Sequence, residues 1–173
     1  ILGSLVTGGN VHDSRMLDKL VTQVTDKVGK PHSIAVDAGY KTPHIAKFLM
    51  DQDIRPVMPY TRPKTKDGYL RKYEYVYDEY FDAYLCPEGQ ILSYRTTTRD
   101  GYKQYASNPL ECKDCPLLER CTQSKNHTKM IHRHVWQEYI EEVDHLRHTE
   151  RNKTLYAKRK ETIERVFADA KEK

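Results

Sequence analysis

The chain has 173 residues, of which 38% are hydrophobic and 31% are charged, with a formal net charge of +4 at pH 7. This length allows one domain with an insertion, and a mean hydropathy of −0.84 indicates broad polar surfaces. No run of 18 apolar residues and no secretory signal pattern occurs, which argues against membrane-spanning and secreted proteins, so we expect a cytoplasmic protein.

The first 60 residues alternate between strand and helix patterns. Thr42 and Pro43 suit the N-cap and the first position of a helix. Strands are predicted over residues 1–7, 33–37 and 54–60, and helices over residues 15–24 and 42–53. This order predicts a mixed or parallel α/β core.

A different pattern occupies residues 61–134, where tyrosine, proline and glycine recur and all four cysteines occur. Aromatic and β-branched residues alternate with charges over residues 73–98, which predicts an antiparallel ribbon with a turn at residues 87–90. We interpret residues 61–134 as a β-rich insertion between residues 1–60 and residues 135–173. Helical spacing returns over residues 135–146 and 161–171. Residue 1 lies in an apolar run and residue 173 in a helical pattern, so we expect a fragment of a larger protein or an eroded reading frame.

Asp37 is an acidic residue at the end of a predicted core strand, directly before a glycine-containing turn. This is the position at which open α/β sheets bind ligands. The alternative is that Asp37 caps the following turn. Glu164 is a second candidate carboxylate, on the last predicted helix, and its alternative role is a surface pair with Lys160.

Basic residues gather in two parts of the chain. Residues 61–73 carry five Lys or Arg residues against one Asp, and the last fifty residues mix many cations with histidines. These are candidate surfaces for phosphate groups. The alternative is an ordinary solvated loop and helix face.

The cysteines form a second constellation. They are Cys86, Cys112, Cys115 and Cys121, so that one cysteine precedes a C-x2-C-x5-C cluster. In a cytoplasmic protein such a cluster favours metal binding over disulfides. Four thiolates suit Zn²⁺, while the spacing also resembles the [4Fe–4S] staple of some DNA-processing nucleases. The metal would fasten the insertion; the alternative is four unlinked thiols.

Three segments occur in a specific order: VTGGNVHDSRML at 6–17, AVDAGYKTPHIAKFL at 35–49 and YAKRKETIERVFADAKEK at 156–173. In this order they resemble the second half of an insertion-sequence transposase with an RNase H-like DDE catalytic domain. The resemblance spans nearly the whole chain. It implies a partial RNase H-like α/β fold, because the first strand and the first catalytic aspartate would lie upstream of residue 1.

The resemblance also implies roles for individual residues. Asp37 corresponds to the second catalytic carboxylate of this family and Glu164 to the third. Tyr156, Arg159 and Lys171 match the remaining members of the helical Y-x-x-R...E-x6-K signature. Four residues separate Arg159 from Glu164, where the common form has three, so Lys160 is an alternative for the basic position.

The implied chemistry is phosphodiester cleavage and strand transfer at transposon ends. Two Mg²⁺ (or Mn²⁺) ions about 4 Å apart would activate the attacking oxygen and neutralise the leaving oxygen, and carboxylates are the ligands that such hard ions prefer. Asp37 would bridge the ions and Glu164 would hold one. The implied contacts to DNA phosphates come from Tyr156, Arg159, Lys160 and Lys171. His12 and Asp13 are weaker candidates, and Asp13 is expected to cap a helix.

The expected partner is double-stranded DNA, at transposon ends and at the target, with a homodimer as a further expectation and no membrane. A nucleoid-associated location follows. Because the first aspartate would lie outside the chain, we expect this chain alone to be inactive in cleavage. Two alternatives stay open: a catalytically inert, metal-stapled DNA-binding relic, and an RNase H-like nuclease without strand transfer.

Overall fold

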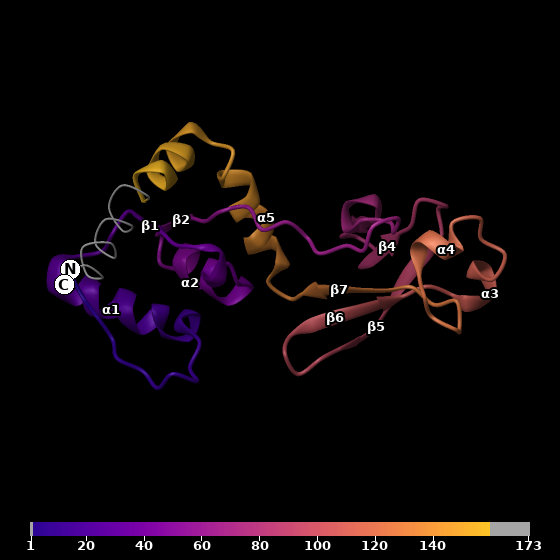
Figure 1. Cartoon of the computed structure of the whole chain (residues 1–173), viewed down its shortest axis with the longest axis horizontal. Coiled ribbons are helices and arrows are strands. Elements are labelled where there is room, and N and C mark those ends of the chain that lie inside the picture. The colour runs from indigo at the N-terminus through magenta and orange to yellow at the C-terminus, as the bar shows by residue number, and fades with distance from the viewer. Residues whose placement is uncertain (1, 160–173) are drawn as a thin grey trace. The chain divides into compact units, whose positions relative to one another are not determined.

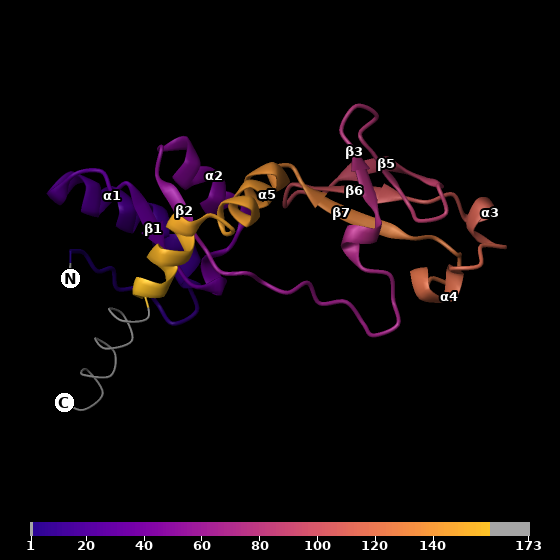
Figure 2. The same ribbon diagram turned by 90° about the horizontal axis from the view of Figure 1, so that it is seen from above.

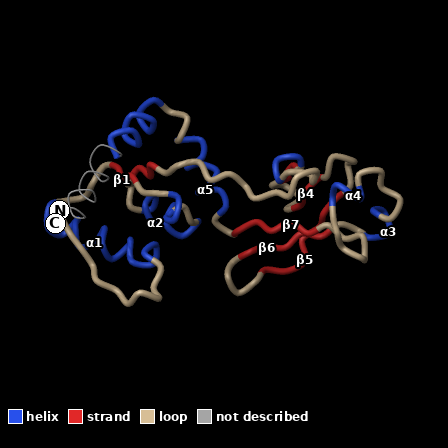
Figure 3. Tube along the Cα trace, viewed as in Figure 1, coloured by secondary structure: helices blue, strands red, loops and turns tan. Residues whose placement is uncertain are grey.

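A computed structural model describes residues 2–159 of the chain (Figure 1). The chain divides into two compact units, Ile1–Thr61 with Trp136–Lys173 and Arg62–Val135. Helices dominate the first unit and strands the second, as Figure 3 shows. The structure is therefore mixed α/β. In the described residues no helix is both long and apolar enough to cross a membrane.

The first unit is built around a short parallel strand pair. Its elements are η1 (Asp13–Met16), α1 (Leu17–Val28), β1 (Ser33–Ala35), η2 (Ala38–Tyr40), α2 (Pro43–Asp51), β2 (Arg55–Val57) and α5 (Gln137–Leu146). β1 and β2 are parallel, with Ile34 opposite Pro56, so α2 is the crossover of a strand–helix–strand unit. The predicted α/β alternation is confirmed here.

The strand predicted over residues 1–7 is wrong, because residues 2–7 have no regular secondary structure. A strand needs a neighbour for its backbone N–H and C=O groups. In the described part of the chain β1 and β2 pair with each other alone, in a sheet of two strands. An apolar run without a partner strand therefore stays irregular.

Local sequence explains the helix boundaries in this unit. The Thr42 side chain accepts a hydrogen bond from the Ile45 N–H at 3.2 Å, and Pro43 occupies the first turn of α2. Both features are favoured at helix starts. The core lies where α1, α2 and α5 meet the strand pair; its buried members are Leu17, Val21, Val36, Ile45, Ala46, Leu49, Ile54, Met58 and Val143.

Residues 150–159 are helical, and side chains at their start anchor them to β2. The buried Asn152 amide donates to the Pro56 carbonyl at 3.0 Å and accepts from Arg55 Nε at 2.5 Å. Arg55 also donates to Thr149 Oγ1 at 3.0 Å. These bonds hold the last described helix, yellow in Figure 1, against the strand that follows α2. The predicted helix over residues 161–171 lies outside the described residues.

The second unit is a five-stranded antiparallel sheet in the order β3-β4-β5-β6-β7. Figure 2 shows β6 and β7 side by side in this sheet. Its strands are β3 (Val76–Asp78), β4 (Ala83–Leu85), β5 (Ile91–Thr97), β6 (Tyr102–Ala106) and β7 (Met130–His134), with η3 (Lys72–Glu74), α3 (Pro109–Cys112) and α4 (Leu118–Cys121) beside them. The antiparallel ribbon predicted over residues 73–98 is confirmed. The predicted turn is confirmed too, since the Cys86 N–H donates to the Gln90 carbonyl at 3.0 Å and Gly89 has a φ of 71°.

Aromatic rings fill much of the core of this sheet. Tyr105 is fully buried, and its ring lies edge-on to Tyr84, with ring centres 5.1 Å apart. The buried members of this core are Leu70, Tyr75, Tyr84, Leu92, Tyr105 and Ile131. Tyrosine adds apolar area but brings a hydroxyl that needs a partner. Each buried tyrosine hydroxyl therefore requires a polar side chain nearby as its hydrogen-bond partner.

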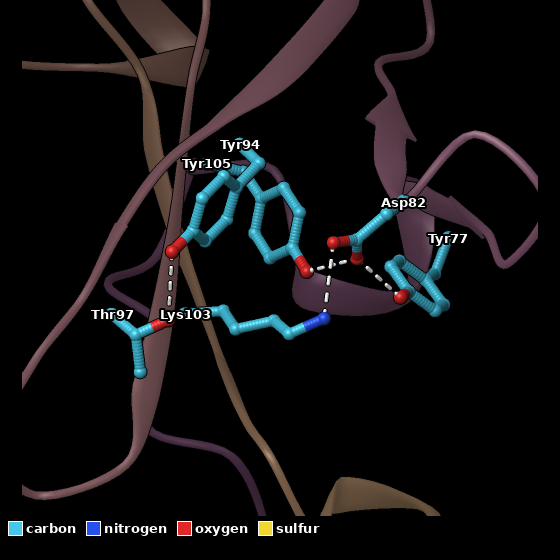
Figure 4. Close-up of polar contacts among 6 residues, drawn as sticks. All are labelled: Tyr77, Asp82, Tyr94, Thr97, Lys103 and Tyr105. Carbon is cyan, nitrogen blue, oxygen red and sulfur yellow. Dashed lines mark hydrogen bonds and ion pairs between the residues drawn. The ribbon is translucent and has the colours of Figure 1, made fainter.

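Asp82 supplies that partner for two of the tyrosines (Figure 4). Its Oδ1 accepts hydrogen bonds from Tyr105 at 2.6 Å and Tyr77 at 2.7 Å, and its Oδ2 accepts one from Lys103 Nζ at 3.0 Å. The Tyr105 hydrogen bond, then those of Tyr77 and Lys103, lowers the pKa of Asp82 to about 2 against the opposing effect of burial. Burial foremost, and then the Asp82 hydrogen bond, raises the pKa of both tyrosines.

Candidate functional site

Asp37 lies two residues after the end of β1, at the carboxyl end of the parallel strand pair. The preceding residue, Val36, is still held by a backbone hydrogen bond of 3.1 Å from its N–H to the Val57 carbonyl. Asp37 Oδ1 accepts a hydrogen bond from the Gly39 N–H at 2.9 Å and so caps η2. Its side chain is 51% exposed. Oδ1 of the carboxylate caps a turn, while half of the side chain remains exposed. The capping role is therefore compatible with ligand binding by this carboxylate.

The turn after Asp37 packs against the segment that precedes α1. A Cβ atom built on Gly39 would lie 3.3 Å from Asp37 Oδ1 and 3.8 Å from His12 Cε1, so the imidazole and the carboxylate approach the same glycine. The pKa of Tyr40 is raised by burial first and then by the charges of Asp13 and Asp37. The structure therefore gathers His12 and two carboxylates around η2.

The prediction that Asp13 caps a helix is wrong. The N-cap of η1 is His12, whose Nδ1 accepts from the Ser14 N–H at 3.2 Å and lies 2.7 Å from Ser14 Oγ. Asp13 lies in the first turn of η1 instead. An imidazole nitrogen takes the place of the expected carboxylate because any acceptor at this position satisfies the free N–H groups of the turn.

Arg159 reaches Asp37 from the other end of the chain. Its Nη2 lies 3.9 Å from Asp37 Oδ2, and its side chain is 19% exposed. Tyr156, one turn earlier, has its ring 5.9 Å from the Arg159 guanidinium carbon. Two residues predicted to share a site, 122 positions apart in the sequence, are therefore close together. The anchoring of Asn152 on β2 directs this helix toward the end of β1.

Three of the predicted site residues, Lys160, Glu164 and Lys171, lie outside the described residues. The convergence of Asp37 with Glu164 therefore stays a prediction. Over residues 2–159, no group of three or more His, Cys, Asp or Glu side chains is placed so that it could hold a metal ion.

The four cysteines belong to the second unit and line one small cavity. Cys86 follows β4, Cys112 ends α3, Cys115 lies in the next turn and Cys121 ends α4. All four are free thiols. Their cavity has a volume of about 20 Å³, and apolar side chains such as Leu92 and Leu117 share its lining.

Hydrogen-bonding groups lie beside two of these sulfurs. The Gln90 N–H donates to Cys86 Sγ at 3.3 Å, and the Tyr75 hydroxyl lies 3.2 Å from Cys121 Sγ. Burial is the largest influence on the Cys121 thiol and raises its pKa, and the nearby Cys112 and Cys115 raise it further, while Tyr75 and Lys129 act in the opposite direction.

Sequence reasoning missed several residues that build these sites. Arg55 and Asn152 hold the C-terminal helix on β2, and Lys41, which is nearly buried, pairs with Asp144 of α5 at 2.5 Å. Tyr75 and Lys129 lie beside the thiols. No local motif marks them, because each acts through a partner distant in the sequence.

Comparison with known proteins gives one match. The family model described as a transposase DDE domain matches residues 85–173, just over half of the chain. This region contains the Y-x-x-R segment and all four cysteines, whereas Asp37 precedes it. No curated protein and no solved structure gives a significant match. With more than half of its length matched by this model, the chain belongs to the transposase DDE domain family.

Proposed function

We propose that the chain is the catalytic part of a DDE transposase that cleaves and joins DNA strands at transposon ends on an RNase H-like core. Family membership supports a transposase. The observation that carries the finer proposal is the approach of Arg159, from the signature helix, to Asp37 at the end of β1. Asp37 and Glu164 are the proposed catalytic carboxylates, and Glu164 lies five residues beyond Arg159.

DDE transposase domains generally use divalent metal ions, and the chemistry of Asp37 fits such an ion. Its carboxylate is a hard oxygen ligand and half of its side chain is exposed. Asp37 and Glu164 would hold Mg²⁺ or Mn²⁺, which would activate the attacking oxygen and neutralise the leaving oxygen. The Gly39 N–H on Oδ1 orients the carboxylate, so that Oδ2 is the atom directed at the site.

Arg159 contributes positive charge to the same place. A guanidinium 3.9 Å from a half-exposed carboxylate forms a weak ion pair, worth at most about 1 kcal/mol. A guanidinium can also bind a phosphate, with two parallel N–H···O bonds. We assign Arg159 to a DNA phosphate, together with Tyr156, Lys160 and Lys171, and Asp37 to the metal ion.

The test separates metal binding from DNA cleavage. Mn²⁺ binding is measured by the loss of the free-ion electron paramagnetic resonance signal, and nicking by relaxation of supercoiled plasmid with Mg²⁺ or Mn²⁺. Asp37→Asn and Glu164→Gln should each weaken Mn²⁺ binding at least tenfold and remove any nicking. Asp53→Asn is the matched control, because Asp53 is an exposed carboxylate two residues after α2, and its oxygen lies 3.7 Å from Lys30 Nζ.

Different results support different functions. Nicking without joined products, in the presence of a cleaved transposon end, would favour the nuclease. DNA binding without Mn²⁺ binding would favour the inert DNA-binding protein. Equal Mn²⁺ binding by the native chain and by Asp37→Asn would overturn the assignment of Asp37.

A further inference from the structure

The thiol cavity of the second unit has no part in the transposase chemistry proposed above. Its four cysteines come from three separate pieces of chain: the turn after β4, the α3 turn and the end of α4. Every cysteine of the protein lines this one cavity, and none forms a disulfide. The turn after β4 and the chain between β6 and β7 therefore meet at this cavity.

The polar groups around the sulfurs indicate what the cavity holds. A thiol is a weak hydrogen-bond acceptor, whereas a thiolate is a strong one. Cys86 Sγ accepts the Gln90 N–H, and Cys121 Sγ lies within hydrogen-bond distance of the Tyr75 hydroxyl. Lys129 lies beside Cys121, where its ammonium donates to the Cys121 carbonyl at 2.8 Å and lies 5.0 Å from the centre of the Tyr75 ring. Two donors and a cation therefore surround an otherwise largely apolar sulfur cluster.

We propose that Cys86, Cys112, Cys115 and Cys121 bind a single Zn²⁺ ion as four thiolates. Four thiolates and one Zn²⁺ carry a net charge of −2, and the Lys129 ammonium with the Tyr75 and Gln90 donors offsets it. Such partners orient metal ligands and tune the metal site. The proposal concerns the second unit alone and does not depend on the function of Asp37.

The chemistry of the ligands favours a single ion. Four cysteine thiolates are a complete ligand set for a closed structural zinc site. Among single ions, four soft thiolates in a tetrahedral arrangement select Zn²⁺.

Binding requires a small rearrangement of the cysteines. As placed, the described side chains include no group of three or more metal-binding residues that could hold an ion. Rotation of a cysteine about its Cα–Cβ bond moves the sulfur between staggered positions at low cost. All four cysteines line one cavity, so such rotations can bring their sulfurs closer to a common centre.

The test measures metal content in the full chain. Protein purified without air is analysed by inductively coupled plasma mass spectrometry, and Co²⁺ exchanged into the site reports tetrahedral thiolate ligands through its visible absorption. We expect one equivalent of zinc, no iron and a colourless protein. Cys86→Ser and Cys112→Ser should each reduce the zinc content to well below one equivalent after dialysis against a chelator.

A matched variant separates loss of a ligand from loss of the fold. Leu117→Ala removes apolar bulk from the same cavity and keeps every sulfur, so it should lower stability yet keep one equivalent of zinc. Lys129→Met keeps the ligands and removes the cation, so it should retain tetrahedral Co²⁺ spectra but release zinc to a chelator at least tenfold faster. An unchanged rate of zinc release would show that Lys129 does not stabilise the bound ion.

Two results would overturn the proposal. A brown protein that contains iron and acid-labile sulfide would show that the cysteines bind an iron–sulfur cluster instead of a single zinc ion. Native chain that contains neither zinc nor iron, and takes up no Co²⁺ under reducing conditions, would show that the thiols bind no metal.

Discussion

Asp82 illustrates how one residue organises the aromatic core of the second unit. It has a φ of 44°, a left-handed backbone conformation that a non-glycine residue adopts at some cost. In return its carboxylate satisfies two tyrosine hydroxyls and a lysine (Figure 4). Aspartate is among the residues that tolerate this backbone region best. The left-handed backbone of Asp82 and the hydrogen bonds of its carboxylate therefore occur together in the same turn.

Acid should destabilise the second unit through Asp82. Its pKa is about 2 in the folded chain, against an ordinary value of 3.8. Because folding depresses this pKa, the stabilisation is fully present above pH 3.8 and is lost as the pH falls toward 2. With its side chain 40% exposed, we expect a contribution of about 1 kcal/mol. Urea unfolding between pH 2 and pH 7 measures it.

The control for this prediction is the uncharged variant. Asp82→Asn should lose the acid-dependent part of the stability, whereas Glu79→Gln, at an exposed carboxylate in the same hairpin, should keep it. Identical pH profiles for the native chain and Asp82→Asn would contradict the assignment.

The C-terminal helix depends on a few polar contacts with β2. Asn152 is 3% exposed, and its amide binds both Arg55 and the Pro56 carbonyl. This contact precedes the Y-x-x-R signature by one helical turn, so it controls the direction in which Arg159 points. Because hydrogen bonds are directional, this amide restricts the orientation of the helix more than apolar contacts do.

Asn152→Ala should destabilise the first unit by about 1–3 kcal/mol. The substitution leaves the Pro56 carbonyl and one Arg55 N–H without their partner in a buried place. Urea unfolding followed by circular dichroism measures the loss. Lys153→Ala is the control, because Lys153 is exposed and pairs with Glu150 on the same helix; its effect should stay within about 0.5 kcal/mol.

Thr42→Ala should cost about 1 kcal/mol, because it removes the side-chain cap of α2. Thr22→Ala is the matched control: Thr22 lies within α1 and its hydroxyl donates to the Asp18 carbonyl instead of capping. A threonine inside a helix contributes little to its stability. An equal loss for both variants in thermal unfolding would mean that capping is not the cause.

At the scale of the whole molecule, charge is unevenly distributed along the chain. Residues 74–94 contain five acidic residues and no Lys or Arg, whereas residues 61–73 contain five Lys or Arg against one Asp. The cations Arg62, Lys64 and Lys66 are exposed. A transposase acts on DNA, so we expect residues 61–73, rather than the acidic residues 74–94, to contact the phosphates.

DNA affinity should therefore fall steeply with salt. Each phosphate contact adds about 0.9 to the slope of log affinity against log salt concentration. Replacing Arg62, Lys64 and Lys66 together with alanine should lower the slope by about two to three units, measured by fluorescence anisotropy with duplex DNA. Lys30→Ala, at an exposed lysine paired with Asp53, should leave it unchanged. A salt-independent affinity would contradict an electrostatic interface.

The sequence by itself determined the local elements and the candidate residues of this protein. Thr42 with Pro43, the turn at residues 87–90 and the alternating aromatic residues predicted α2 and the antiparallel ribbon, because caps, turns and side-chain period are properties of neighbouring residues. The family followed from the order of three short motifs. The approach of Arg159 to Asp37, the Asp82 network and the shared cavity of the cysteines were decided only by tertiary structure. Each depends on partners far apart in the sequence, and their meeting is set by packing and hydrogen-bond satisfaction across the whole unit. The failed strand at residues 1–7 has the same cause, since strand propensity has no effect without a neighbouring strand.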